Sequence, residues 1–441
     1  MKNDRTLLYR GVKGVLRCDE AEVVLGIFGF VMSQYRSLQM AAALIARTTH
    51  TAIPAVMALA RGIWCFAQVR SDGGSGVAWV GRFANERHAI GWLRQLTPEL
   101  EWREFAFSRP RVSLALPRRG GLRKLRQILR LARRLHRRHE YFKVLRVVEL
   151  ILYYSRFVQL FESANFSMAV TSNHSNPHGI AFNLAARRRG VPVVLVAHGM
   201  PVWPVAPLSY DLGVVHCQAA KDIYQRAGCR MHRTIIHGRG QHHVPISVPT
   251  HASMAVGVFL SKDTREQRLR LLLESLLNSG SVGRILVRPH PLNLWDGLDA
   301  FIEGWHSPKI GLSRERSVFE DVHECDVVFA GNSSIHVEAV TAGRPSCYVH
   351  GLDFGPYDLH SFVARGLIWE PPADRPFDPQ EAFRFYQRSG WVDRLREFAN
   401  IDQDVETVGR HVRAAMLELN TSRHPGCDIQ AETEHGLPLQ A

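Results

Sequence analysis

The sequence predicts an α/β protein with two doubly wound, Rossmann-like domains that face a cleft, preceded by a helical and basic N-terminal extension. From residue 164 onward, short β-branched runs alternate with segments of helical spacing, which is the pattern of a parallel sheet covered by helices. The alternation stops at residues 241–253, which hold two prolines and no periodicity, and then resumes. The stretch Asp326–Val349 then gives strand, tight turn, helix and strand in one run.

The part before the alternation is expected to be helical and basic. We assign residues 1–75 to a helical N-terminal region and residues 76–240 to the first domain. Residues 118–147 combine leucines at helical spacing with twelve basic residues and one acid, Glu140. This pattern predicts a basic amphipathic helix on an anionic membrane surface. We expect no nucleic-acid partner, because no aromatic residue alternates with the charges until Tyr141.

The remaining elements follow in order. In the first domain we expect strands at 77–80, 101–108, 166–171, 191–197, 212–216 and 234–237, and helices at 85–96, 177–189 and 218–227. Residues 241–253 are the expected linker, and residues 254–420 the expected second domain, which would bind the nucleotide. Its expected strands are 255–260, 284–287, 309–312 and 326–330, with helices at 265–278 and 335–342 and further helical segments within 381–418. Residues 421–441 are polar and predict a loose tail.

Composition limits the classes of function. The chain has 441 residues and a net charge of +14, which favours an acidic partner such as a phosphorylated substrate or anionic lipid. Its seven cysteines are scattered without a Cys-x-x-Cys pair, so we expect reduced thiols in the cytoplasm rather than disulfides or a zinc site. The sequence shows neither a secretory signal nor a clean apolar run of ~20 residues, which predicts a soluble or peripheral protein.

Candidate donor-binding residues follow the expected strands of the second domain, where doubly wound sheets place their ligands. Ser333 and Ser334 stand at the start of the helix at 335–342, whose positive end favours a phosphate, and Asn332 lies in the turn before them. Glu338 is placed to accept hydrogen bonds from ribose hydroxyls. Taken alone, the two serines are better explained by ordinary helix capping. Further candidates for phosphate binding are Lys262 and Arg288.

Two histidines are candidate catalytic residues. His198 follows the strand at 191–197, and the ordinary pKa of histidine, about 6.5, suits removal of a hydroxyl proton at neutral pH. His290 is held between two prolines, beside Arg288. A histidine bonded within its loop, and a stiff turn, are the alternatives. Walker A, Gly-x-Gly-x-x-Gly, His-Glu-x-x-His and Gly-x-Ser-x-Gly motifs are absent, and no Asp-x-Asp metal site is evident, so we expect neither metal nor cofactor.

Short motifs between about residues 165 and 350 resemble bacterial surface-polysaccharide transferases of the GT-B type. His198-Gly199-x-Pro201 is similar to the base-bearing motif of CDP-glycerol glycerophosphotransferases, and the segments Thr171–His174 and Pro207–Asp211 resemble the acceptor half of such enzymes. His290-Pro291 and Ser333-Ser334 are similar to the motifs with which bacterial polysialyltransferases hold a CMP-sugar. The chain lacks the acidic Glu/Asp-Glu/Asp-Gly motif of the sialyltransferases, so His198 has to be the base. The resemblance thus places Asn173, His174, Tyr210 and Asp211 on the acceptor side.

The resemblance implies an inverting, metal-independent glycosyltransferase at the inner face of the membrane. It would move a sugar from a nucleotide-sugar, including a CMP-linked one, to a growing surface or capsular polysaccharide or a lipid-linked acceptor. A CDP-polyol phosphotransferase of teichoic-acid-like polymer synthesis and a sugar-nucleotide 2-epimerase are the alternative enzymes. A non-catalytic, membrane-associated scaffold of polysaccharide assembly is the alternative from another class.

Overall fold

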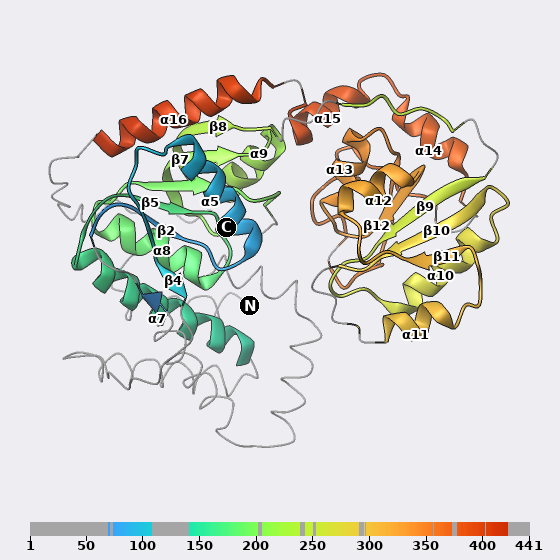
Figure 1. Cartoon of the computed structure of the whole chain (residues 1–441), viewed down its shortest axis with the longest axis horizontal. Coiled ribbons are helices and arrows are strands. Elements are labelled where there is room, and N and C mark those ends of the chain that lie inside the picture. Colours follow the sequence, from blue (N-terminus) through green and yellow to red (C-terminus); the bar gives the residue numbers. More distant parts are fainter. Residues whose placement is uncertain are drawn as a thin grey trace, which may run out of the picture.

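The computed structural model describes residues 69–70, 74–107, 141–201, 205–238, 243–249, 253–290, 295, 297–355, 357–372, 377–401 and 403–421. Most of the expected N-terminal helical region, residues 118–140 of the expected basic helix and residues 422–441 lie outside this part. Figure 1 shows two sheets with helices on both faces of each, as the sequence predicts. Within the described residues, no helix combines the length and apolarity that a membrane span requires.

The first sheet has six parallel strands in the order β3-β2-β5-β6-β7-β8. Their bounds are β2 Ser75–Val80, β3 Trp102–Glu104, β5 Asn165–Thr171, β6 Val193–Val196, β7 Ser209–Val215 and β8 Arg230–Ile236. β1 (Val69–Arg70) and β4 (Ala106–Phe107) form a separate antiparallel pair. β6 is buried along its whole length, which explains its unbroken apolar sequence.

Helices cover both faces of this sheet. They are α5 (Ala84–Leu96), α7 (Tyr141–Glu162), α8 (Pro177–Arg188), α9 (Gln218–Arg226) and α16 (Val405–Thr421). One face packs on α7 and α8, where Phe157 and Phe182 meet edge to face at 5.3 Å. The other packs on α5 and α16, with Val412 and Met416 fully buried. α16 follows the second domain in sequence, and all but its last residue lies in our expected range 254–420, yet it packs on the first sheet.

The second sheet has five parallel strands in the order β11-β10-β9-β12-β13. Their bounds are β9 Met254–Phe259, β10 Val282–Arg288, β11 Ile310–Leu312, β12 Val327–Ala330 and β13 Ser346–Tyr348. The helices around it are α10 (Glu266–Leu277), α11 (Leu298–Glu303), α12 (Val318–Glu324), α13 (Ile335–Thr341), α14 (Pro379–Tyr386) and α15 (Trp391–Ala399). Each sheet with its helices thus forms a Rossmann-like domain, as the sequence predicts.

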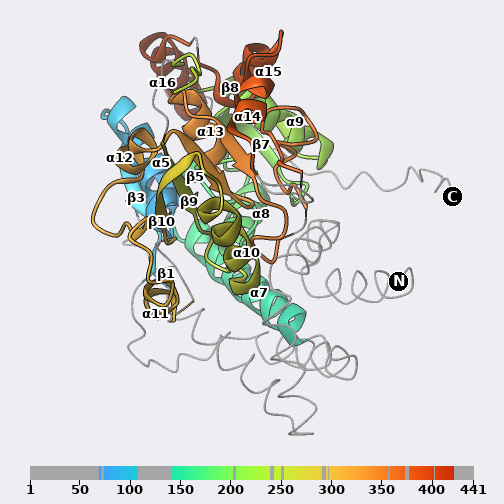
Figure 2. The same ribbon diagram turned by 90° about the vertical axis from the view of Figure 1, so that its right-hand side faces the viewer.

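The two sheets are joined by a short connection and by contacts near α9 and α15. The described part of the expected linker, residues 243–249, holds no helix or strand, and the Val244 N–H donates to the Thr341 carbonyl at 3.0 Å. Arg365 forms an ion pair with Asp222 of α9 at 3.7 Å. In both Figure 1 and Figure 2, α15 and α16 lie at one end of the molecule and α7 at the other.

Candidate functional site

In the first domain, the loops after β2, β5 and β6 start side by side. Val80 is level with Thr171, and Thr171 with Leu195, so these neighbouring strands end at one edge of the sheet. The loop after β5 carries Asn173 and His174, and the loop after β6 carries His198. The structure therefore brings together three of the residues that the sequence analysis selected.

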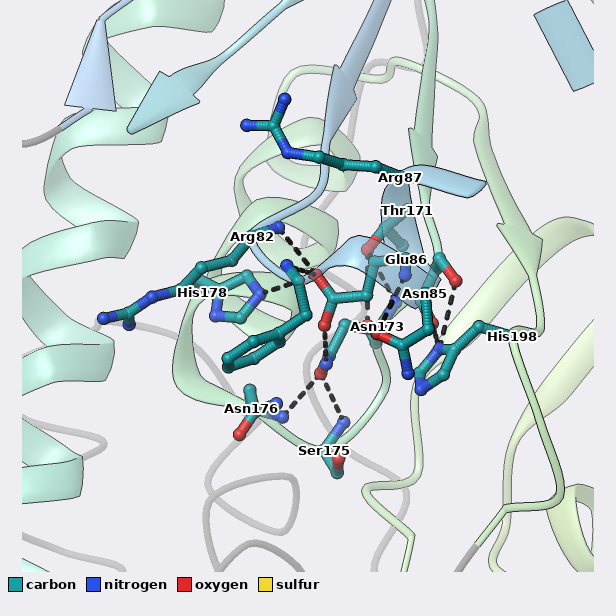
Figure 3. A network of polar contacts seen from close by, with 12 residues as sticks. Arg82, Asn85, Glu86, Arg87, Thr171, Asn173, Ser175, Asn176, His178 and His198 are labelled. Atoms are coloured by element: carbon teal, nitrogen blue, oxygen red, sulfur yellow. Dashed lines mark hydrogen bonds and ion pairs between the residues drawn. The ribbon is translucent and has the colours of Figure 1, made fainter. Parts of the chain in front are cut away.

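The imidazole of His198 is held by the loop after β5 (Figure 3). Its Nδ1 lies 2.7 Å from the backbone carbonyl of Ser172 and 3.1 Å from the Ser172 hydroxyl. A carbonyl oxygen can only accept, so Nδ1 carries the proton of the neutral ring and donates it to this bond. Nε2 is then the unprotonated nitrogen. This arrangement suits a general base that takes a proton at Nε2.

His174 is a buried neighbour of His198 and not a surface group. It shares a hydrogen bond of 2.8 Å with the Tyr224 hydroxyl of α9. Burial, reinforced by the nearby charge of His198, lowers the pKa of His174 to about 3. His174 is therefore neutral at any physiological pH and braces the loop against α9.

A buried carboxylate, Glu86 at the start of α5, lies behind these loops. Its side chain is 1% exposed and receives bonds from the backbone N–H groups of Arg82 (2.7 Å) and Phe83 (3.3 Å), with His178 Nε2 at 3.5 Å. Burial alone would raise the pKa of Glu86. The bonds from His178, the Arg82 backbone and the Asn173 amide outweigh burial and lower this pKa to about 2. Glu86 and His178 are functional candidates that the sequence analysis missed.

Tyr210 and Asp211 lie away from this cluster, because β7 begins at Ser209 and they stand at its amino end. The Tyr210 ring is fully buried, and its hydroxyl has no hydrogen-bond partner among the described residues. The Asp211 carboxylate accepts from the Val193 N–H at 2.7 Å and thereby joins β7 to the start of β6. The structure thus gives both residues packing or bracing contacts.

In the second domain, β10, β9 and β12 also end level, since Phe259 pairs with both Arg288 and Ala330. The loops that follow carry Lys262, His290 and the Asn332–Ser334 turn. His290 is half-buried, and burial together with the positive charge of Lys262 lowers its pKa. Lys262 and His290 thus follow neighbouring strands at the same edge of the sheet, and the charge of Lys262 acts on His290.

In the turn after β12, the two serines make few hydrogen bonds to the described residues, whereas Asn332 makes several. Ser334 is the N-cap of α13 but makes no side-chain bond to the helix, and the Ser333 hydroxyl accepts from the Ile335 N–H at 3.3 Å. Glu338 follows in the first turn of α13 and is half-buried. Asn332, in contrast, donates to Asp353 at 2.8 Å and accepts from the Leu359 N–H at 2.8 Å. Asn332 therefore fixes the shape of the turn, and Ser333 and Ser334 beside it are partly exposed.

Arg288 is turned toward the protein. Its guanidinium forms an ion pair with the buried Asp321 of α12 and donates to the Arg316 carbonyl at 2.8 Å. The charge of Asp321 thus offsets that of Arg288, and the Ser313 hydroxyl completes the bonds of this carboxylate at 2.7 Å. The contacts of Arg288 explain how it braces the loop after β11, and its contact with a phosphate stays a prediction.

No protein-family model matches the chain, and no curated protein matches its sequence. Solved structures of similar shape include a Neisseria meningitidis UDP-GlcNAc 2-epimerase bound to UDP-GlcNAc, with 10% identity and a TM-score of 0.46 over 78% of this chain and 100% of that one. The glycotransferase of kitacinnamycin has 12% identity and a TM-score of 0.45, over 78% and 98%. The wall teichoic acid polymerase TagF has 11% identity and a TM-score of 0.38, over 87% and 99%.

Proposed function

We propose that this chain is an inverting, metal-independent glycosyltransferase that moves a sugar from a nucleotide-sugar to a surface polysaccharide or lipid-linked acceptor. The proposal depends on the hydrogen bond from His198 Nδ1 to the Ser172 carbonyl, which leaves Nε2 free to take the proton of an acceptor hydroxyl. A hydroxyl activated in this way attacks the sugar directly and displaces the nucleotide, which inverts the anomeric centre.

The donor would bind at the carboxyl edge of the second sheet. Lys262, His290, Ser333 and Ser334 are proposed to hold its phosphates, and Glu338 its ribose. The positive charge of Lys262 would offset the charge that develops on the leaving phosphate, which is why we propose no metal ion. Addition of EDTA should therefore leave turnover unchanged, whereas a loss that Mg²⁺ restores would contradict this part of the proposal.

Nucleotide binding is tested by a thermal-shift panel of CMP, CDP, UDP, GDP and their sugar conjugates. A binder at 100 times its Kd should stabilise the protein by about 2.7 kcal/mol. Ser333→Ala with Ser334→Ala should weaken that binding. Ser253→Ala is the matched control, because Ser253 precedes β9 at the opposite edge of the sheet. If no nucleotide binds, a non-catalytic scaffold becomes the better hypothesis.

The base is tested with the nucleotide-sugar that the panel identifies. His198→Ala should lower kcat by roughly 10²–10⁴ with donor binding intact. His232→Ala, at an exposed position of β8, is the control and should leave kcat unchanged. The product then separates the enzymes: a glycosidic bond supports the transferase, a phosphodiester the polyol phosphotransferase, and a free epimerised sugar nucleotide the 2-epimerase.

We also propose that the enzyme works in the cytoplasm at the inner membrane, held there by residues 118–147. The twelve basic residues of this range would bind anionic headgroups. Co-sedimentation with vesicles of phosphatidylglycerol, but not of phosphatidylcholine alone, would support this location. Equal recovery with both vesicles, or with neither, would contradict it.

A further inference from the structure

The Glu86 carboxylate joins two loops that are distant in sequence. One oxygen accepts from the backbone of the loop after β2, and the other accepts from the Asn173 side-chain amide at 2.5 Å. Glu86 is thus a fixed acceptor between α5 and the loop after β5, and its lowered pKa means that it never presents a proton to Asn173 at physiological pH.

Asn173 connects Glu86 to the loop after β5, because both the NH₂ group and the carbonyl oxygen of its side chain form hydrogen bonds. The NH₂ group donates to Glu86, and the carbonyl oxygen accepts from the backbone N–H groups of Ser175 (3.0 Å) and Asn176 (2.7 Å). Its backbone N–H also lies 3.2 Å from the Thr171 hydroxyl. The peptide unit between Thr171 and Asn173, which includes the Ser172 carbonyl, is therefore held from both sides.

We propose that Glu86 is a positioning residue for His198. Through Asn173 it orients the Ser172 carbonyl, and this carbonyl keeps the proton of His198 on Nδ1. The catalytic consequence of this link rests on the proposed function, in which Nε2 of His198 is the base. Figure 3 shows the chain of contacts from Glu86 through Asn173 beside His198.

The polarity of the contacts makes the proposal testable. In Glu86→Gln, the oxygen of the new amide can keep the bonds from the backbone N–H groups of Arg82 and Phe83. Its NH₂ group then faces the NH₂ group of Asn173, and two donors meet. Rotating the Asn173 amide moves this conflict to the N–H groups of Ser175 and Asn176. The double variant Glu86→Gln with Asn173→Asp removes the conflict, since the Gln donates to one Asp oxygen and the other accepts from the two N–H groups. The same total charge is kept.

The tautomer of His198 is measured by ¹⁵N chemical shifts in histidine-labelled full-length protein at about pH 8, with the signal assigned by its loss in His198→Gln. The wild type should show only the Nδ1–H form, Glu86→Gln a mixture of both tautomers, and the double variant the Nδ1–H form again. Glu99→Gln, at an exposed carboxylate of the same domain, is the matched control and should resemble the wild type. With the identified donor, kcat of Glu86→Gln should fall by roughly 10²-fold, and the double variant should recover most of this loss.

If Glu86 has only a structural role, Glu86→Gln lowers the melting temperature and leaves the tautomer of His198 unchanged. That result overturns the inference, whatever the activity of the variant. If Glu86→Gln does not fold, Asn173→Asp breaks the same link, because it removes the NH₂ donor to Glu86 and keeps an oxygen for the N–H groups of Ser175 and Asn176. A tautomer that shifts as expected, in a protein whose turnover does not depend on His198, would support the positioning link and contradict the proposed function instead.

Discussion

The side chain of Gln403 accepts a hydrogen bond from the backbone N–H of Gly238 at 2.7 Å, where the chain leaves the first sheet and where it later returns. The Gln403 NH₂ group also donates to the Ile236 carbonyl at 2.7 Å. A methyl group at Gly238 would come within 2.6 Å of the Asn400 carbonyl, so the two segments pass in close contact. One amide thus holds together the two connections between the domains.

We expect Gln403→Ala to destabilise the protein by roughly 1–3 kcal/mol, because it leaves the Gly238 N–H and the Ile236 carbonyl without their partner. Gln387→Ala, at an exposed position at the end of α14, should change the free energy of unfolding by less than about 0.5 kcal/mol. Urea unfolding of both variants measures the difference. Equal stabilities would show that Gln403 does not hold the connections.

Acid should weaken the contribution of Glu86 to stability. Its pKa is about 2 in the folded protein against an ordinary 4.5, so the unfolded chain takes up the proton first as the pH falls. The contribution is complete above about pH 4.5 and is lost toward about pH 2, and the shift corresponds to about 3 kcal/mol.

The test compares the free energy of unfolding of the wild type and Glu86→Gln between about pH 7 and pH 3. The difference between the two proteins should shrink as the pH falls. Glu99→Gln loses only a surface ion pair with Arg413 and should differ from the wild type by less than about 1 kcal/mol. A difference for Glu86→Gln that stays constant over this range would contradict the lowered pKa.

Removal of a tyrosine hydroxyl should cost more free energy of unfolding at Tyr224 than at Tyr357, although both Tyr→Phe changes delete the same atom. Tyr224→Phe leaves the buried His174 without the partner at 2.8 Å and should cost roughly 1–3 kcal/mol. Tyr357, which is 50% exposed, donates to Glu370 at 2.6 Å, and its change to Phe should cost at most about 1 kcal/mol, because water replaces the lost bond. Thermal unfolding of both variants checks this order, and a larger loss for Tyr357→Phe would refute it.

The packing of α16 on the first sheet predicts a large effect of Met416→Ala. Met416 is fully buried among residues of the first domain, so the truncation should cost roughly 2–5 kcal/mol. Leu271→Ala, at a half-exposed position of α10, should cost less than about 1 kcal/mol. A cost for Met416→Ala as small as that for Leu271→Ala would mean that α16 does not complete the first domain.

The sequence predicted both parallel sheets, because each strand is a short run of β-branched residues that can be recognised without knowing its contacts to distant parts of the chain. Of α7 it predicted only residues 141–147, the end of the expected helix at 118–147, and it began β7 at Leu212 where the structure begins it at Ser209. The strands β6 and β12 and the helix α13 were confirmed within a few residues, since glycine, proline and serine mark their ends.

The candidate site was harder to predict, because its important contacts are distant in sequence. Glu86 meets Asn173 and His178 across 87 and 92 residues, and nothing near Glu86 shows that this one glutamate of an amphipathic helix is buried. Arg288 meets Asp321 across 33 residues, which no local pattern records. His198 could be selected from its place after a buried strand, but its tautomer depends on the Ser172 carbonyl and required the structure.

Helix α16 also determines the order in which this protein can be completed during translation. All six strands of the first sheet leave the ribosome well before residues 405–421, and until then the face that holds Trp79 and Val214 lacks part of its cover. The second domain is synthesised in this interval. A nascent chain therefore exposes an apolar sheet face until the second domain has been synthesised. A stop codon before α16 would leave this face uncovered permanently and make the truncated protein prone to aggregation.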